Sequence, residues 1–492
     1  YPAIEKTALG ESYRTFRENY SDRKTAVYVG SRGGMLHAFD GGSFRWGDNP
    51  STEFEEYRGY FKWDNPNNSA SALYGTGDEL WAYIPSNLLS RLKNNVPGKG
   101  DPQGSSAYVD ASPAIADVYV NNGWRTVLLS AQGNGGDSVF ALDVTEPENP
   151  VFMWEFLDPD LFRSSSSPAV GQIGRIAVGG QERWAAFFVS GQTNCTTDEE
   201  SEGSTYCYPS IFVIDIADGS VIERIFLDSE SEGIGGIPSG QPAIMDFDNN
   251  GFIDRLYVGT AVQGDSGNRG YMYKVNLPDD GTGSITNCVI NRDFITEDGD
   301  SVDEMFQPIH ASPTVVKDGG VVKIFFGTSD SPYVSGDAEQ ADHYYFLGYI
   351  DSDGKGECGS ADLDWFLKLP AGQRVFASAF AAAGRIYFGT SSADTEDPCE
   401  GFGLEGDGGN EGRLYVLDQD GGFADSDLPY VETGDLNTTP VVEDEHVYFK
   451  SPAAAADSPD GGVQSLGDGV YNNQPVMTGN PDTTRSWWRE VY

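Results

Sequence analysis

A set of short phrases that recur in a fixed order is the strongest constraint on the fold of this chain. One phrase reads SPAIAD at residues 112–117 and returns as SPAVGQ, QPAIMD, SPTVVK and TTPVVED. A second reads RLYVGTA at residues 255–261, with copies from AVYVGS at residue 26 to HVYFKS at residue 446. A third includes FALDV, VIDI and YVLD, and a fourth is aromatic, as in LWAYIP and VFMWEF. The order of the phrases therefore suggests one repeating unit.

Each phrase is a run of β-branched and aromatic residues bounded by Gly, Asp or Ser, which predicts a strand. Four strands per unit, repeated about seven times, predict a seven-bladed β-propeller with four-stranded blades. An irregular pair of sandwiches is the alternative, but it would not need the same order throughout. The chain starts inside a unit near Ala26 and ends on a fourth phrase near Trp488, so we expect the two ends to complete one blade. We expect a single all-β domain over residues 1–492.

Two stretches lack the strand pattern and predict short helices, Glu11–Arg23 and Pro85–Asn95. The second places Leu88, Leu89 and Leu92 on one helical face. Long inserts also interrupt the units, and the largest, at about residues 41–78, carries many aromatic side chains among acidic ones. Such an insert either forms a binding surface or packs back on the ring, and the sequence leaves both open.

The charge balance excludes several kinds of partner. The chain has 76 acidic and 31 basic residues, which gives a formal net charge of -45. It would repel nucleic-acid phosphates and anionic lipids, so we expect it to bind neither. The longest apolar run, Val375–Ala383, is too short to span a bilayer. The sequence starts at Tyr1 without a basic-then-apolar leader, and we interpret it as a form from which a signal peptide has been removed.

The five cysteines are spread through the chain and none forms a CxxC pair. Cys195 and Cys207 bracket an acidic segment that has almost no hydrophobic anchor. We predict a disulfide between them, which fits an exported protein. One cysteine is left over, and the sequence does not identify it.

The stretch MDFDNNGFID, at residues 245–254, has the spacing of a calcium loop. Asp246, Asp248 and Asn250 occupy places one, three and five, Phe252 offers its backbone carbonyl at place seven, and Asp254 takes place nine. Gly251 at place six allows the sharp turn. A solvated polar turn is the alternative, but three carboxylates within nine residues would repel one another without a cation.

The rest of this stretch distinguishes it from an EF-hand. Its twelfth place holds Tyr257, where an EF-hand has Glu, and a strand phrase follows in place of a helix. We therefore predict a Ca²⁺ loop in a hairpin between the first two strands of a blade. Mg²⁺ demands stricter octahedral geometry and is the less suitable ion.

No catalytic motif emerges, so we predict that the chain is not an enzyme. The four histidines are scattered, and HExxH, GxSxG and Walker patterns do not occur. DSDGKGE, at residues 351–357, places Lys355 where a ligand should be and reads as a hairpin turn. GFGLEG, at residues 401–406, matches a dinucleotide pattern only formally, because no helix pattern follows it.

Several of these stretches together resemble a known family. They are residues 13–42, which contain VYVGSRGGMLHAFD, then ELWAYIP, the DxDxN loop and the terminal RSWWREV. From Tyr13 to Tyr492 the chain resembles the C-terminal propeller domain of PilC/PilY-type type IV pilus tip-associated proteins. The resemblance implies a modified, quinoprotein-like seven-bladed propeller. It also implies one calcium ion held by Asp246, Asp248, Asn250, the Phe252 carbonyl and Asp254.

The same resemblance implies a function. It points to pilus assembly, calcium-dependent control of extension and retraction, twitching motility and surface adhesion. The implied partners are minor pilin subunits and a host or abiotic surface ligand, and the implied location is the pilus tip, reached by export through the periplasm. Family members often carry an N-terminal von Willebrand factor A-type region, which this sequence does not show. No Arg-Gly-Asp triplet is present, so the resemblance does not imply integrin binding.

Two other functions stay open at this point. One is a generic extracellular propeller scaffold. The other is a quinoprotein dehydrogenase, which would need adjacent cysteines beside the quinone, and this sequence has no adjacent pair.

Overall fold

The structure is a computed structural model that describes most of the chain between residues 9 and 473. The longest stretches outside the description are residues 1–8, 50–58, 64–71, 91–107, 162–171, 198–204, 228–236, 262–269, 292–306, 330–342, 393–411, 423–429, 434–438, 451–462 and 474–492.

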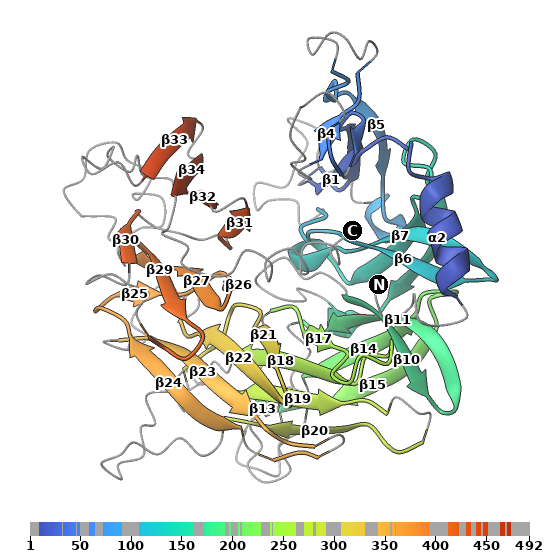
Figure 1. The fold of residues 1–492 in the computed structure, drawn as a ribbon. Coiled ribbons are helices and arrows are strands. Elements are labelled where there is room, and N and C mark those ends of the chain that lie inside the picture. Colours follow the sequence, from blue (N-terminus) through green and yellow to red (C-terminus); the bar gives the residue numbers. More distant parts are fainter. Residues whose placement is uncertain are drawn as a thin grey trace, which may run out of the picture.

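Seven antiparallel sheets follow one another in sequence order around the molecule (Figure 1). The first contains β1 (Ala26–Gly30), β2 (Leu36–Asp40) and β5 (Glu79–Tyr83). The second contains β6 (Ala114–Val120), β7 (Gly123–Ala131), β8 (Ser138–Asp143) and β9 (Val151–Leu157). The third contains β10 (Gln172–Val178), β11 (Gln181–Val189), β14 (Ser210–Asp215) and β15 (Val221–Phe226).

The fourth, fifth and sixth sheets repeat the same up-and-down order, with both β16 and β17 paired to β18 in the fourth, whereas the seventh exchanges its last two strands. The fourth contains β16 (Ile237–Pro238), β17 (Ala243–Met245), β18 (Arg255–Ala261), β19 (Met272–Asn276) and β20 (Thr286–Val289). The fifth contains β21 (Thr314–Asp318), β22 (Val321–Gly327), β23 (Tyr345–Asp351) and β24 (Asp362–Lys368). The sixth contains β26 (Phe380–Ala382), β27 (Arg385–Gly389), β29 (Arg413–Asp418) and β30 (Tyr430–Glu432). The seventh contains β31 (Val441–Glu443), β32 (His446–Lys450), β34 (Val470–Asn473) and β33 (Val463–Gly467), in that spatial order.

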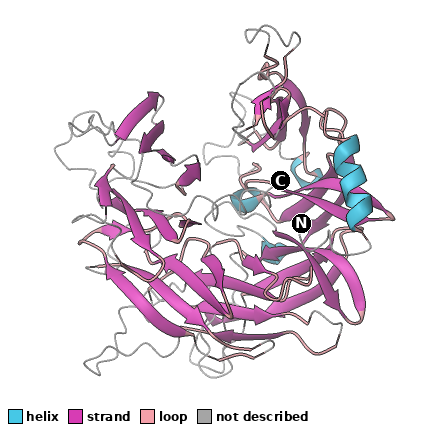
Figure 2. Ribbon diagram, in the orientation of Figure 1, coloured by secondary structure: helices cyan, strands magenta, loops and turns pink. Residues whose placement is uncertain are grey.

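The short elements lie between and beside these sheets (Figure 2). Three two-stranded ladders pair β3 (Phe44–Arg45) with β4 (Tyr60–Phe61), β12 (Thr196–Thr197) with β13 (Thr205–Tyr206), and β25 (Gln373–Arg374) with β28 (Ser391–Ser392). The described helices are α2 (Gly10–Asn19) and three 3₁₀ turns, η2 (Ser86–Leu88), η4 (Gly133–Gly135) and η5 (Pro159–Leu161). No helix in the described part of the chain is long and apolar enough to cross a membrane.

The hydrophobic core consists of layers between neighbouring sheets. Six clusters of buried side chains each join two successive sheets, from the first and second to the sixth and seventh. In one of them, Phe187 and Ile225 of the third sheet share a cluster with Leu256 and Val258 of the fourth. Burial of such side chains on both faces of a sheet drives the stacking of blades. The predicted seven-bladed, all-β propeller is confirmed.

In the first sheet, β1 takes the position that the second strand of a blade, such as β18, takes in the other sheets. The carbonyl of Ser31, the residue after β1, accepts the N–H of Val109 at 3.1 Å. In the fourth sheet, the carbonyl of Thr260, near the end of β18, accepts the N–H of Ile309 at 3.2 Å in the same way. All of β18 is buried, whereas Val27 of β1 is 56% exposed. In the described part of the chain, β2 is the one strand that pairs with β1. The predicted blade closure near Trp488 falls in residues 474–492, outside the described residues, and stays a prediction.

Hydrogen exchange tests this prediction. The N–H of Ser31 donates to the Met35 carbonyl across the β1–β2 hairpin. Because successive N–H groups of a strand point to opposite edges, those of Ala26, Tyr28 and Gly30 point to the edge of β1 that faces away from β2. If the C-terminal segment completes the blade, these amides exchange slowly in the whole chain and fast in a chain that stops at Asn473. Fast exchange in both proteins would contradict the closure.

The predicted helices and insert are confirmed in part. α2 overlaps the first predicted helix, beginning one residue earlier, and buries Tyr13 and Phe16 against the second sheet. The described part of the second predicted helix contains a 3₁₀ helix, Ser86–Leu88, but the predicted shared face is wrong: Leu88 is buried and Leu89 is exposed, because one tight turn cannot align both side chains. In the insert, β3 and β4 place the ring of Phe61 5.5 Å from Phe44 and 4.9 Å from Tyr74. These described aromatic residues therefore pack on one another.

A disulfide joins Cys288 of β20 to Cys358, which lies between β23 and β24. It links the fourth sheet to the fifth, and the sequence did not identify this pairing. Cys195 and Cys207 lie outside the described residues, so their predicted bond stays a prediction. The ladder of β12 and β13 pairs Thr196 with Tyr206, the neighbours of those two cysteines.

Candidate metal centre

The acidic loop forms the hairpin between β17 and β18 in the fourth sheet. Met245 pairs with Arg255, so residues 246–254 make the turn. Two of its residues have positive φ, Asn249 at 58° and Gly251 at 92°. Asn and Gly are the residues that adopt this left-handed region most readily. The predicted hairpin position of the loop is confirmed.

Three carboxylates converge inside this turn. One oxygen from each of Asp246, Asp248 and Asp254 lies within 4.8 Å of the others, and no other described group of His, Cys, Asp and Glu meets this condition. Backbone N–H groups hold the first of them in place, because Asn250 and Gly251 donate to the two oxygens of Asp246 at 3.0 and 2.8 Å. The turn therefore directs the acidic side chains toward a common point.

Asp254 is the most deeply buried of the three. The residue is only 3% exposed, and its Oδ1 atom accepts the N–H of Phe247 at 3.0 Å. Oδ2 is buried without a hydrogen-bond partner among the described residues. Burial raises the pKa of Asp254 to about 6, against the lowering effect of the Phe247 N–H. A buried carboxylate oxygen without a partner costs free energy, and a cation beside it would remove that cost.

The environment of Asp246 acts in the same direction. Burial raises the pKa of Asp246, and the neighbouring charge of Asp248 adds to this effect against the backbone N–H groups. Two of the three carboxyl groups are thus held where their charged forms are disfavoured, which a bound cation would reverse. Carboxylate oxygens in a flexible loop suit a hard divalent cation. This acidic triad could hold a metal ion.

The other two predicted ligands make contacts of their own. The Oδ1 atom of Asn250 accepts the N–H of Phe252 at 2.9 Å, and its Nδ2 donates to Oδ2 of Asp248 at 3.2 Å. The ring of Phe252 lies 4.1 Å from the guanidinium carbon of Arg175. Ligation by the Asn250 side chain and the Phe252 carbonyl stays a prediction.

The loop also contacts the sheets on both sides of its own. The N–H of Ile253 donates to the carbonyl of Arg175, in β10 of the third sheet, at 2.7 Å. The ammonium group of Lys317, in β21 of the fifth sheet, donates to the carbonyl of Phe247. The guanidinium carbon of Arg255 lies 3.9 Å from the ring of Phe247. Sequence analysis missed these basic residues, because they come from three different sheets.

The acidic DSDGKGE stretch lies in the connection between the paired strands β23 and β24, as its interpretation as a hairpin turn predicts. Asp351 and Asp353, of the DSDGKGE stretch, form ion pairs with Lys274. Their oxygens are therefore engaged within the protein. GFGLEG lies outside the described residues.

Sequence analysis also missed one Ser–His–Glu set near the β1–β2 hairpin. Ser31 Oγ lies 3.0 Å from His37 Nε2, and His37 Nδ1 lies 3.6 Å from a Glu79 oxygen. The Ser31 hydroxyl also lies 3.0 Å from the Met35 carbonyl. The N–H groups of Ser31 and Gly34 are engaged within the turn. These two N–H groups therefore offer no oxyanion hole, and the set fits a structural role in the hairpin.

The fold and the loop define a class, a seven-bladed propeller with an acidic hairpin loop that could hold a metal ion. The family described as the PilY1 beta-propeller domain matches residues 3–363, more than half of the chain. The chain belongs to the PilY1 β-propeller domain family.

Several named proteins are similar to this chain. The "Type IV pilus biogenesis factor PilY1" of Pseudomonas aeruginosa strain PAO1 is 28% identical over 254 residues, which cover 50% of this chain and 17% of that protein. A "Type IV pilus biogenesis factor PilY1 homolog" of Xylella fastidiosa strain Temecula1 is 25% identical over 249 residues, which cover 50% of this chain and 16% of that protein. The matched region is thus a small part of each relative.

A solved structure shares the fold over most of the chain. The crystal structure of the Pseudomonas aeruginosa PilY1 C-terminal domain is similar with a TM-score of 0.57 and 20% identity. The similarity covers 86% of this chain and 85% of that one.

Proposed function

We propose that this chain is the calcium-binding, non-enzymatic propeller of a type IV pilus assembly and tip protein. One observation carries the proposal: a PilY1-family propeller gathers Asp246, Asp248 and Asp254 within 4.8 Å in a single hairpin loop. Oδ2 of Asp254, buried without a hydrogen-bond partner in the part of the chain that the structure describes, supports a cation at that point.

Ca²⁺ is the proposed ion, with Asp246, Asp248, Asn250, the Phe252 carbonyl and Asp254 as its ligands. All five offer oxygen atoms, which Ca²⁺ takes in a flexible shell of about six to eight ligands at roughly 2.3–2.6 Å. The loop follows the places one, three, five, seven and nine that suit such a shell. The strictly octahedral geometry of Mg²⁺ is harder to satisfy with a loop of this spacing.

The ion would act as an electrostatic centre between three sheets. It would neutralise the carboxylates and hold the loop whose residues contact Arg175 on one side and Lys317 on the other. The packing of the third, fourth and fifth sheets would then depend on calcium. Any partner surface formed by those sheets would depend on it too.

The proposed biological role is control of pilus extension and retraction, with effects on twitching motility and surface adhesion. Proposed partners are minor pilin subunits and a host or abiotic surface ligand, at the pilus tip outside the cell. The family and the printed names of the relatives support a pilus role. The excess of acidic over basic residues disfavours nucleic acid as a partner.

Calcium should stabilise the folded chain against heat. A ligand that binds only the folded state adds about 2.7 kcal/mol when its free concentration is a hundredfold above Kd. We expect the melting temperature to rise with calcium and to reach a higher value than with the same concentration of magnesium. Differential scanning calorimetry measures both. A melting temperature that does not respond to millimolar calcium would sink the calcium assignment.

A cellular experiment tests the role itself. In the source bacterium, a chromosomal Asp254→Ala change should alter the number of surface pili and the zone of twitching while leaving the amount of protein unchanged. Counts of sheared pili and immunoblots measure the two quantities. If bacteria carrying a variant that no longer binds calcium show normal piliation and twitching, the proposal that calcium controls the pilus is wrong.

A further inference from the structure

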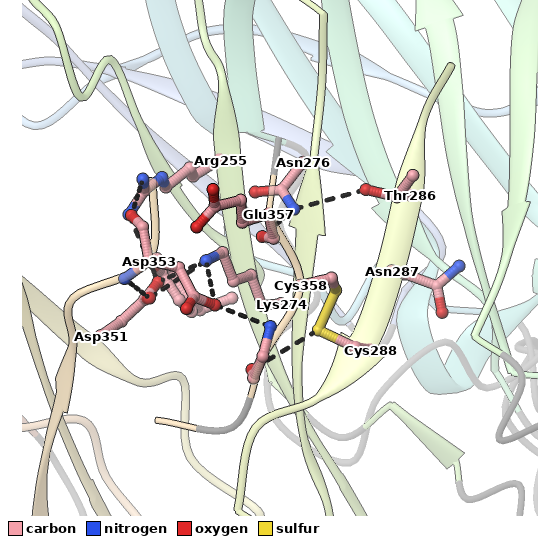
Figure 3. Close-up of a disulfide and its surroundings, with 12 residues drawn as sticks. Arg255, Lys274, Asn276, Thr286, Asn287, Cys288, Asp351, Asp353, Glu357 and Cys358 are labelled. Atoms are coloured by element: carbon pink, nitrogen blue, oxygen red, sulfur yellow. Dashed lines mark hydrogen bonds and ion pairs between the residues drawn. A yellow bond between two sulfur atoms is a disulfide. The ribbon is translucent and has the colours of Figure 1, made fainter. Parts of the chain in front are cut away.

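The connection between β23 and β24 of the fifth sheet lies across the edge of the fourth sheet (Figure 3). Three contacts fasten it there. Cys358 forms the disulfide with Cys288 of β20, and the Glu357 carbonyl accepts Nδ2 of Asn276 at 2.8 Å. The N–H of Ala361 donates to the carbonyl of Ile290 at 2.9 Å. We call the described residues of 351–361 the clamp segment.

The clamp segment surrounds two buried cations of the fourth sheet. Arg255 is 1% exposed, and its guanidinium donates to the carbonyl of Asp353 at 2.8 Å and lies 3.3 Å from a carboxylate oxygen of Asp351. Lys274 is fully buried, and its Nζ lies 3.0 Å from Oδ1 of Asp351 and 3.2 Å from Oδ2 of Asp353. The segment therefore fixes the position of both cations, as the labelled side chains in Figure 3 show.

Arg255 connects the clamp segment to the acidic hairpin loop of residues 246–254, the proposed metal loop. It follows Asp254 directly in the chain, and its guanidinium carbon lies 3.9 Å from the ring of Phe247. The N–H of Phe247 in turn donates to Oδ1 of Asp254 at 3.0 Å. A movement of the guanidinium would therefore disturb the Phe247 ring and, through that residue, the N–H that bonds to the buried carboxylate.

We propose that Arg255 is a positioning residue for the metal loop, and that the Cys288–Cys358 disulfide sets the metal affinity by holding the clamp segment around it. This inference rests on the proposed calcium function. Without the disulfide, the clamp segment keeps hydrogen bonds to the fourth sheet but loses its covalent link. Asp353 then holds Arg255 for a smaller fraction of the time. Ion binding must then also order Arg255 and Phe247, and the free-energy cost of this ordering weakens the binding.

The test compares calcium affinity among variants of the full chain by isothermal titration calorimetry. Cys288→Ser with Cys358→Ser removes the covalent link, and Arg255→Lys keeps the charge but loses the planar contacts of the guanidinium. Outer-shell partners of metal ligands typically contribute about 10- to 100-fold in affinity. We expect each change to weaken calcium binding roughly tenfold. The combined variant should be little weaker than Arg255→Lys alone, because both changes act through one route.

Arg224 offers a matched control. Its guanidinium carbon lies 4.6 Å from the ring of Phe212, and it pairs with Asp160 between the second and third sheets. Arg224→Lys therefore removes the same kind of stacked, ion-paired arginine away from the metal loop. We expect its calcium affinity to equal that of the wild type. The melting temperature in calcium-free buffer then separates a general loss of stability from a specific loss of affinity.

The outcomes separate this inference from the function on which it rests. A wild-type chain that binds no calcium overturns the proposed function. A wild-type chain that binds calcium, with unchanged affinity in the serine pair and in Arg255→Lys, overturns only the inference. If the serine pair does not fold, dithiothreitol reduces the disulfide in the folded wild type to two thiols and is itself oxidised. Calcium affinity before and after that reduction gives the same comparison when it is measured in a Cys195→Ser, Cys207→Ser chain, which lacks the other predicted disulfide.

Discussion

Asp254→Ala is expected to weaken calcium binding by about a hundredfold or more. Outer-shell residues contribute roughly 10- to 100-fold, so a direct ligand should reach at least the upper end of that range. Asp254 supplies one of the three converging carboxylates and the buried oxygen that has no hydrogen-bond partner among the described residues. The variant should stay folded without calcium, because burial already disfavours the charged form of this side chain. Calorimetric titration and circular dichroism measure the two quantities.

A second hairpin aspartate serves as the control. Asp218 accepts the N–H of Ser220 at 2.9 Å in the turn between β14 and β15, and it belongs to no described carboxylate cluster. Asp218→Ala should therefore keep the calcium affinity of the wild type. Equal affinity in Asp254→Ala and the wild type would falsify the site. If Asp254→Ala does not fold in calcium-free buffer, the residue is needed for the folding of the hairpin.

Calcium binding should also weaken in acid. The pKa of Asp254 in the calcium-free fold is raised to about 6 from its usual 3.8 by burial. The fold therefore holds a proton there more readily than the unfolded chain does, and the calcium-free protein gains stability as the pH falls from about 6 toward 3.8. The same proton competes with calcium, so the apparent affinity should fall about tenfold per pH unit below roughly 6. Titrations at pH 7.5 and 5 measure this, and Asp254→Asn should reduce the difference.

The architecture and the acidic hairpin loop could be predicted from the sequence because their signals are local. Each strand is a short run of β-branched and aromatic residues, and the runs repeat in one order, so the number of blades follows from the pattern. The carboxylates of Asp246, Asp248 and Asp254 lie within nine residues, and their convergence needs only one turn. The hairpin position followed from the strand phrases on either side.

The surroundings of the loop were beyond sequence analysis because they depend on contacts between sheets. Cys288 and Cys358 are 70 residues apart, and with five cysteines the pairing is not determined by spacing. Lys274 lies inside an apolar strand phrase, where a charged residue is unusual and predicts a buried partner, and Arg255 begins another such phrase. That signal was present, but the identity of the partner, Asp351, required the stacking of the fourth and fifth sheets.

Asp351→Ala should cause a large loss of stability without removing a metal ligand. The carboxylate of Asp351 lies 2.9 Å from the Lys274 ammonium and 3.3 Å from the Arg255 guanidinium, and it accepts the hydroxyl of Tyr257 at 2.6 Å. Lys274 is fully buried and Arg255 is 1% exposed, so water cannot replace the lost partner. Breaking a buried ion pair from one side costs about 3–5 kcal/mol, and here the Asp353 carboxylate, 3.2 Å from Lys274, would be left to compensate two buried cations. Urea unfolding in calcium-free buffer measures the change in the free energy of unfolding.

Two further variants show whether the uncompensated charge causes that loss. Lys24→Met removes a partly exposed ion pair with Glu148, and such pairs contribute at most about 1 kcal/mol, so its unfolding should change little. Lys274→Met combined with Asp351→Ala removes one of the stranded cations. It should therefore be more stable than Asp351→Ala alone, since an apolar side chain costs less to bury than an ammonium that has lost one of its two carboxylate partners. If the double variant is no more stable than the single one, the loss comes from the cavity and the Tyr257 hydrogen bond, and the charge explanation is wrong.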